Sequence, residues 1–351
     1  MTVPQRLRVV VATPLSEELC ARILAAEPRI DLVRDQSLLP PMRWPGDHGG
    51  DPSFVRTTEQ QSAFDALVDS AEALYGVPDE NPAALARTVR ANPGLRWVQT
   101  MPAGGGAQVK GANLAQDELQ DLVFTTSAGV HGASLAEFAV FGVFAGAKDL
   151  PRLLTQQARK EWTGRWCMQQ VHEMTVAVLG MGNIGRDTAA RLIALGARVI
   201  GVSRTPADVP GLAGTVHPDD LDKAVADADA LVVTLPGTES THKMVNADVL
   251  AAVKPGITVV SVGRGTVIDE DALVEALRDG RIGFAALDVF YTEPLAQDSP
   301  LWTLPNVLVS PHTAALNDAE DRRIADLFAV NAARFLDGGP MINPVNTVEF
   351  Y

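Results

Sequence analysis

Cysteine is scarce in this chain. Only Cys20 and Cys167 occur among its 351 residues, and neither belongs to a spacing typical of a metal site. A secreted domain stapled by disulfides is therefore excluded, and we expect two reduced thiols in a cytoplasmic protein. The first residues, MTVPQRLRVVVATP, turn polar too soon to form a signal peptide, which agrees with that location.

Long apolar runs are also missing. The longest extends from Leu135 to Ala147 and is interrupted by Glu137. It is shorter than the roughly 20 apolar residues that a membrane-spanning helix requires. We expect a buried helix there and no association with a membrane.

Basic residues are outnumbered by acidic ones. There are 29 Lys and Arg against 43 Asp and Glu, which gives a formal net charge of −14. Such a surface repels a phosphate backbone, and no cluster of Lys and Arg offsets it. Nucleic acids and anionic membranes are therefore excluded as partners.

What the chain does contain is an alternation of strand and helix patterns. The first series predicts strands at residues 7–13, 30–34, 72–76, 95–100 and 122–127, and helices at 16–26 and 82–91. The second series predicts strands at residues 174–180, 197–203, 229–236, 257–262, 283–289 and 306–310. Further helices are expected at 133–148, from 151 onward, and at 319–337. This alternation, over a length that favours two domains, predicts an α/β fold with two doubly wound parallel-sheet domains.

A long loop, residues 39–60, interrupts the first series after its second strand. Its Pro, Gly and Asp residues predict a surface loop that is longer than most connections in α/β units. Loops of this length are either functional or simply tolerated, and the sequence leaves both alternatives open.

The glycine-rich turn GMGNIG follows the strand predicted at 174–180. Gly180, Gly182 and Gly185 fit G-x-G-x-x-G, the turn that binds a dinucleotide between a strand and a helix. The first glycine permits the tight turn, the second lets the backbone approach a pyrophosphate, and the third lets helix and strand pack closely. The pyrophosphate would bind at the helix N-terminus, whose free N–H groups favour an anion. A tight turn without a ligand is the alternative.

The acid that normally binds the ribose is absent at the end of the next strand. Ser203 occupies that position and is followed by Arg204 and Thr205. Without a carboxylate, a ribose 2′-phosphate is not repelled, and these three residues can bind it by charge-assisted and hydroxyl hydrogen bonds. We predict a preference for NADP, and a site that accepts NAD as well is the alternative.

Three further candidates lie just after predicted strands, namely Arg264, Glu293 and His312. The carboxyl ends of parallel strands meet at the edge where open α/β sheets bind ligands. Singly, each has a structural explanation, as a strand-end arginine, a turn residue before proline or a hydrogen-bonded histidine. Together, behind a nucleotide turn, they indicate a catalytic site. The other histidines have no metal-ligand spacing, so we expect no metal.

The chain resembles the D-isomer-specific 2-hydroxyacid dehydrogenases. The segments that carry the resemblance are TTSAGVHGASLAEF, GMGNIG, LPGTEST, VGRGTVIDEDAL, DVFYTEPL and PLWTLPNVLVSPHTA. The resemblance implies that Arg264 binds the substrate carboxylate and that His312 exchanges a proton with the substrate. Glu293 would stabilise the charged imidazole, and hydride would pass between nicotinamide C4 and substrate C2.

The same resemblance extends the predicted contacts. Further cofactor-binding residues would be Asn183, Ile184, Leu235, Pro236, Thr241, Val262, Gly263 and, beside the nicotinamide carboxamide, Asp288. The backbone of Ala103, Gly104 and Gly105 would also hold the substrate carboxylate. This loop departs from the common family pattern, which has bulkier residues at two of these small positions.

The resemblance also implies a discontinuous chain path. A flavodoxin-like catalytic domain is expected from residues 1–129 and 314–351, and a Rossmann cofactor domain from residues 130–313. A cleft between the domains would close over the substrate, and we hypothesise that the long loop, with Trp44, covers it. The helix after GVHG and the segment EWTGRW resemble the family's dimer contact, so a homodimer is expected.

The favoured function is the reduction of a small 2-keto acid, such as glyoxylate or hydroxypyruvate, with NADPH. A D-3-phosphoglycerate or other D-2-hydroxyacid dehydrogenase is the alternative among enzymes. The first of these is less favoured because the end of the chain, NPVNTVEFY, leaves no room for the regulatory domain that many of them carry. Outside the enzymes, the alternative is a nucleotide-sensing, corepressor-like binding module.

Overall fold

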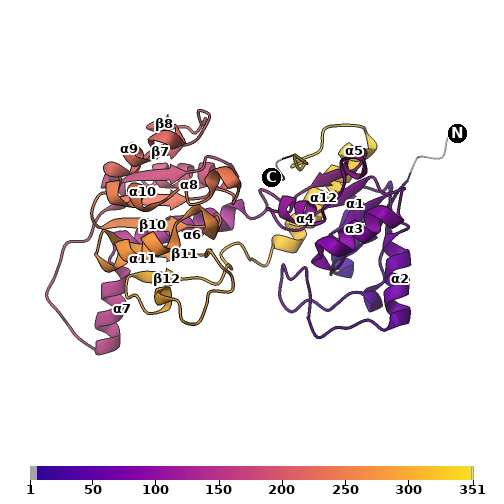
Figure 1. Ribbon diagram of the computed structural model, residues 1–351, viewed down its shortest axis with the longest axis horizontal. Helices are drawn as coiled ribbons and strands as arrows, with labels where there is room; N and C mark the ends of the chain where they lie inside the picture. Colours follow the sequence, from indigo (N-terminus) through magenta and orange to yellow (C-terminus); the bar gives the residue numbers. More distant parts are fainter. Residues whose placement is uncertain (1–5, 349, 351) are drawn as a thin grey trace. The chain divides into compact units, whose positions relative to one another are not determined.

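The computed structural model describes residues 6–348 and residue 350. They form two units. Unit 1 comprises the chain up to His131 and again from Leu316, and unit 2 comprises Gly132–Ala315. Each unit has one parallel β-sheet covered by helices (Figure 1). The predicted α/β fold with two doubly wound parallel-sheet domains is therefore confirmed.

The sheet of unit 1 has five strands in the order β2-β1-β3-β4-β5. Their bounds are Leu7–Val11 (β1), Ile30–Val33 (β2), Ala73–Tyr75 (β3), Trp97–Gln99 (β4) and Val123–Thr125 (β5). This is the flavodoxin-like order, in which the carboxyl ends of all strands meet at one edge. The strands are short and mostly buried, because helices shield both faces.

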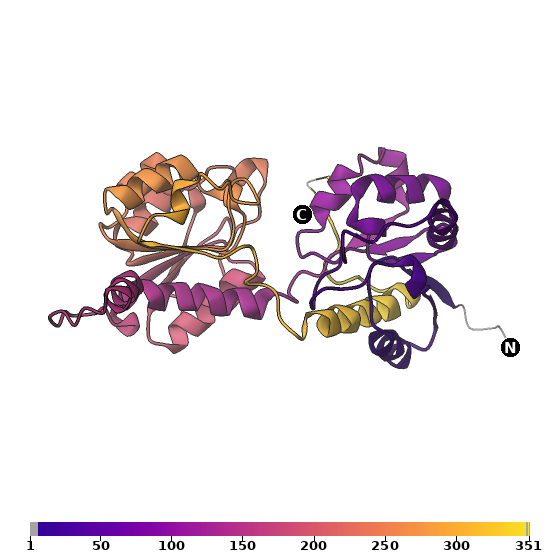
Figure 2. The same cartoon turned by 90° about the horizontal axis from the view of Figure 1, so that it is seen from below.

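Six α-helices belong to the described part of unit 1. They are α1 (Glu17–Ala26), α2 (Thr58–Val68), α3 (Pro82–Ala91), α4 (Gly106–Gly111), α5 (Gln116–Gln120) and α12 (Glu320–Leu336). In Figure 2, α12 (yellow) and α1 (dark indigo) lie on one side of the sheet, and α3 (purple) lies on the other. The ring of Phe328 in α12 stacks on Trp97 of β4 at 4.6 Å, so the returning helix completes the core.

The sheet of unit 2 has seven strands in the order β12-β11-β10-β9-β6-β7-β8. Their bounds are Thr175–Leu179 (β6), Arg198–Val202 (β7), Gly214–Val216 (β8), Ala230–Val233 (β9), Ile257–Ser261 (β10), Ile282–Leu287 (β11) and Val307–Val309 (β12). This is the Rossmann order with one added strand, and the order reverses between β6 and β9. The edge strand β8 was missed by the sequence prediction, because it is three residues long and its glycine is exposed.

Helices cover both faces of this second sheet. α6 (Gly132–Ala147) and α8 (Asn183–Ala194) pack on one face, and α9 (Leu221–Ala226), α10 (Ala247–Ala252) and α11 (Glu270–Arg278) pack on the other. α6 lies close to the sheet because a Cβ at Gly142 would be 2.7 Å from the side chain of Val260. Within the described residues, no helix is both long and apolar enough to cross a membrane.

Two segments depart from the compact core of their units. The long loop runs from residue 39 to residue 57, between a 3-10 turn η1 (Gln36–Leu38) and α2. In unit 2, α7 (Leu150–Arg159) buries none of its residues, and the segment after it extends away from the sheet (Figure 1).

Candidate active site

The glycine-rich turn connects β6 to α8 as predicted. Gly180 has a φ of +100°, which favours glycine, and a Cβ at Gly185 would overlap the carbonyl group of Gly180. A Cβ at Gly182 would meet no atom within 4 Å, so this glycine faces open space at the start of α8. The first helical residues, Asn183 and Ile184, present free N–H groups there, because no side chain caps the helix. The turn therefore fits a dinucleotide pyrophosphate.

The loops after β9 and β10 lie beside this turn. Leu235, Pro236 and Thr241 follow β9, and Val262 and Gly263 follow β10. A Cβ at Gly263 would lie 2.9 Å from the amide nitrogen of Leu235, so the two loops touch. Thr241 Oγ1 donates to the carbonyl oxygen of Pro236 at 2.7 Å and fixes the first loop. The structure thus gathers these residues at the switch point of the sheet, and their contact with a cofactor remains a proposal.

The residues predicted to select NADP lie at the end of β7. The Ser203 amide donates to the Val216 carbonyl at 3.0 Å, which extends the pairing of β7 with β8. Thr205 N lies 3.4 Å from Ser203 Oγ, and both Arg204 and Thr205 are exposed. A hydroxyl and a guanidinium are therefore presented at the place where a ribose-binding acid usually stands.

Glu293 and His312 form a hydrogen-bonded pair. His312 Nδ1 lies 2.6 Å from Glu293 Oε2, and the other carboxylate oxygen accepts from the amide of Phe290 at 2.9 Å. Because Nδ1 faces the carboxylate, Nε2 is the nitrogen left to exchange a proton with a substrate. The side chains of His312 and Glu293 are 43% and 35% exposed, so a ligand can reach them.

The loop that carries His312 is fixed by Asp288. His312 itself has a φ of +53°, in the left-handed region that non-glycine residues rarely adopt. Fully buried Asp288 accepts three hydrogen bonds from this loop through Oδ1. They come from Ser310 Oγ at 2.5 Å and from the amides of Thr313 and Ala314 at 3.0 Å each. The sequence placed Asp288 beside the cofactor and missed this second role, because only the fold brings the two segments together.

Arg264 follows β10 and approaches the same turn. Its Nη1 donates to the carbonyl oxygen of Gly263 at 2.7 Å, and the residue is exposed. It lies close enough to Glu293 for the two charges to interact. A Cβ at Gly265 would overlap the backbone of Phe290, so this glycine allows the Arg264 segment to pack against the Glu293 turn. The structure therefore brings the three catalytic candidates to one edge of unit 2.

The predicted carboxylate loop belongs to unit 1. Ala103, Gly104 and Gly105 lie between β4 and α4, and a Cβ at Gly105 would overlap the hydroxyl of Thr100. Its binding of a substrate carboxylate remains a proposal. Within residues 6–348 and 350, no group of three or more His, Cys, Asp and Glu side chains could hold a metal ion.

Comparison with known proteins gives the same family that the motifs indicate. The family description "D-isomer specific 2-hydroxyacid dehydrogenase, NAD binding domain" matches residues 140–314. A glyoxylate/hydroxypyruvate reductase B of Pectobacterium atrosepticum is 35% identical over 219 residues, which cover 61% of this chain and 68% of that protein.

Solved structures also match nearly the whole chain. A D-isomer specific 2-hydroxyacid dehydrogenase from Xanthobacter autotrophicus, in complex with NADPH and MES, has a TM-score of 0.75 and 30% identity, covering 99% of this chain and 100% of that one. An NADPH-dependent glyoxylate/hydroxypyruvate reductase from Sinorhizobium meliloti, in complex with NADP and sulfate, has a TM-score of 0.75 and 25% identity, with the same coverage.

Proposed function

The chain belongs to the D-isomer-specific 2-hydroxyacid dehydrogenase family, and on that premise we propose that it reduces glyoxylate, hydroxypyruvate or a similarly small 2-keto acid with NADPH. It is an NAD(P)-dependent oxidoreductase that transfers hydride to or from C2 of its substrate. The observation that carries the proposal is the His312–Glu293 pair beside Arg264, at the carboxyl edge of a Rossmann sheet. The corepressor-like alternative is not favoured, because the named relatives are reductases and dehydrogenases.

Each residue of the site has a part in the reduction. Arg264 binds the substrate carboxylate with its planar fork of N–H donors and polarises the adjacent carbonyl. His312 Nε2 donates a proton to the carbonyl oxygen, and the Glu293 carboxylate stabilises the imidazolium that this requires. The reduced nicotinamide, when bound, supplies the hydride that reaches C2. In the oxidative direction His312 accepts the proton instead.

A panel of 2-keto acids tests the substrate class. With NADPH in excess, kcat/KM is expected to be highest for glyoxylate and hydroxypyruvate and lower for pyruvate, phenylpyruvate and branched keto acids. Chiral analysis of the product from hydroxypyruvate is expected to give the D isomer. A preference for phenylpyruvate or a branched keto acid would contradict the assignment to small substrates.

The preference for NADP is supported by the end of β7. Ser203→Asp places a carboxylate where the 2′-phosphate would bind, and like charges brought together cost several kcal/mol. We expect the Kd of NADPH to rise by about 10²-fold, since each ~1.4 kcal/mol is tenfold. The Kd of NADH is expected to fall, because the new acid can accept from the ribose hydroxyls. Fluorescence titration with both nucleotides measures the two constants.

A matched control for this substitution is Ser62→Asp, which adds the same charge at an exposed serine of α2 in unit 1. It is expected to leave both nucleotide affinities unchanged. If Ser203→Asp also left the Kd of NADPH unchanged, the 2′-phosphate would not bind at Ser203.

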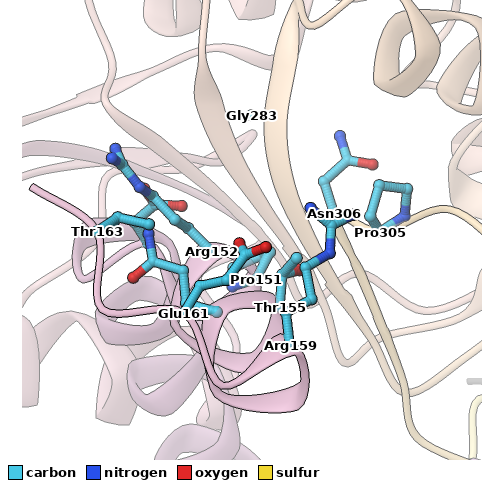
Figure 3. A pocket seen from close by; sticks show the side chains of 11 residues that line it. Pro151, Arg152, Thr155, Arg159, Glu161, Thr163, Gly283, Pro305 and Asn306 are labelled. Atoms are coloured by element: carbon cyan, nitrogen blue, oxygen red, sulfur yellow. The ribbon is translucent and has the colours of Figure 1, made fainter.

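We also propose a homodimer formed through α7 and the segment that follows it. Trp162 is wholly exposed, and Leu153 and Leu154 of α7 are 38% and 53% exposed. Beside α7 lies a hollow of about 380 Å³ that can receive part of a second copy (Figure 3). Its lining includes Arg152 of α7 and Glu161, which follows the helix. A second copy would cover the same patch on both chains, as an isologous interface does.

The oligomeric state is measured by light scattering. The protein is expected to have twice the chain mass of 37.3 kDa, and Trp162→Ser is expected to shift it toward the monomer. Val55→Ser, which removes another largely exposed apolar side chain in unit 1, is the control and should remain dimeric. A monomeric wild type would overturn this interface.

We also propose that the protein is located in the cytoplasm. It is supported by the two cysteines, Cys20 and Cys167, which are both free thiols in the structure.

A further inference from the structure

Unit 1 contains a buried carboxylate to which the proposed function assigns no part. Glu320 is the first residue of α12 and is 2% exposed. Its Oε1 lies 2.8 Å from His131 Nε2, in a hydrogen bond, and 3.6 Å from His48 Nε2. His131 follows β5, and His48 belongs to the long loop. One carboxylate therefore joins three separate segments of unit 1.

The long loop is also docked on α12 through its backbone. The Gly46 amide donates to both carboxylate oxygens of Asp321, at 3.1 and 3.2 Å. Gly46 has a φ of +81°, and a Cβ there would lie 2.8 Å from Glu320 Oε2, so glycine allows this close approach. Inside the loop, Arg43 binds the buried carboxylate of Asp47 with two hydrogen bonds, at 2.7 and 2.9 Å. The loop tip is therefore braced internally and fixed to the helix.

The charges around Glu320 make this contact dependent on its carboxylate. Burial alone would raise the pKa of Glu320, but hydrogen bonding with His131 and His48, together with their attraction, lowers it to about 2. Glu320 therefore stays ionised at any pH near neutrality. His48 Nδ1 lies 4.0 Å from a carboxylate oxygen of Asp321. A buried charge is tolerated only where neighbouring groups compensate it. Neutralising Glu320 would therefore weaken its contacts with His131 and His48.

A second hydrogen bond, between Glu80 and Gln108, lies next to the loop that we propose binds the substrate carboxylate. Glu80 ends the 3-10 turn η2 (Pro78–Glu80) after β3, and its Oε2 accepts from Gln108 Nε2 at 2.7 Å. Gln108 lies in α4, which begins directly after residues 103–105. The long loop contacts the same turn through Arg56, whose Nη1 lies 2.7 Å from Asp79 Oδ1. These contacts thus belong to the segments that follow β2, β3, β4 and β5. That edge of the sheet is where open α/β sheets bind ligands.

We propose that Glu320 is a positioning residue for substrate binding. Through His48 and His131 it fixes the long loop and the segment after β5, and the long loop in turn contacts the turn whose Glu80 holds Gln108 of α4. The proposal rests on the proposed function, because its kinetic readout needs a 2-keto acid substrate. Its effect is on KM, since Glu320 contacts none of the residues assigned to proton transfer.

Glu320→Gln tests the proposal, because it keeps the shape and a hydrogen-bond acceptor and removes the charge. The KM for glyoxylate is expected to rise by about tenfold, within the roughly 10²-fold that a misplacement of about 1 Å can cost. We expect kcat to change by less than about twofold and the Kd of NADPH, measured by fluorescence, to stay that of the wild type. Chymotrypsin is expected to cut after Phe54 faster than in the wild type, because the loop loses its anchor.

Two further variants complete the design. Asp326→Asn removes an exposed acid of the same helix, paired with Arg22, and is expected to match the wild type in every readout. Gly46→Ala leaves every ionisable group in place and forces the loop away from Glu320, so it is expected to raise KM in the same way even if Glu320→Gln does not fold.

Unchanged KM and unchanged cleavage in both Glu320→Gln and Gly46→Ala would overturn the proposal. The proposal would also be overturned if kcat fell, the substrate KM rose and NADPH affinity fell together, because that pattern would indicate a general loss of structure. If the wild-type protein turned over no 2-keto acid, that result would count against the proposed function alone. The cleavage rates would then decide whether Glu320 anchors the loop.

Discussion

His312→Asn is expected to lower kcat for glyoxylate reduction by about 10³-fold, within the 10²–10⁴-fold that a positioned acid–base group contributes. Asparagine can still contact Glu293, but its amide is too weak an acid to protonate the carbonyl oxygen. The loop should keep its place, because Asp288 holds it through Ser310 and through the amides of Thr313 and Ala314. Steady-state kinetics with NADPH measure the loss, and a fluorescence titration should give the Kd of NADPH found for the wild type.

The control for this variant is His217→Asn, since His217 is a half-exposed histidine of unit 2 that pairs with Asp219. It is expected to retain the wild-type kcat. A kcat for His312→Asn within about tenfold of the wild type would be incompatible with its role as the proton donor.

Arg264→Gln is expected to lower kcat/KM for glyoxylate by about 10²–10⁴-fold. The substitution removes two charge-assisted hydrogen bonds to the substrate carboxylate, each contributing about 1.5–3 kcal/mol. Arg264→Lys should recover only a small part, because an ammonium group cannot form the planar two-point contact. Initial rates at subsaturating glyoxylate measure kcat/KM directly.

Arg278→Gln, at an exposed position near the end of α11, is the matched control and should behave as the wild type. NADPH binding should persist in both arginine variants. If Arg264→Gln kept kcat/KM within a few-fold of the wild type, another cation would have to bind the carboxylate.

The fold could be predicted from the sequence where its strands give apolar runs. Central strands such as β6, β9 and β10 are buried between helices and give nearly continuous apolar runs, and the short outer strand β12 still shows one. The edge strand β8, with the sequence GTV, gives no such run. Only its pairing with β7 identifies it as a strand. Local patterns therefore reveal central strands and leave a short edge strand undetected.

The candidate site could be predicted only as far as its motifs extend. The glycine turn, Arg264, Glu293 and His312 each lie in a segment that follows a strand, so the parallel topology alone brings them to one edge. The support of His312 by Asp288 joins segments that only the folded chain places together. The contact between His131 and Glu320 joins residues 189 positions apart, and no local pattern indicates it.

The most direct test of the account is the initial rate of nucleotide oxidation by the wild-type protein after glyoxylate is added. We expect NADPH oxidation with a kcat within the range of about 1–10³ s⁻¹ that is typical of enzymes, and a distinctly lower kcat/KM with NADH. Faster turnover with NADH would contradict the assignment of Ser203 and Arg204 to a 2′-phosphate. No oxidation of either nucleotide with glyoxylate or hydroxypyruvate would contradict the proposed reductase function itself.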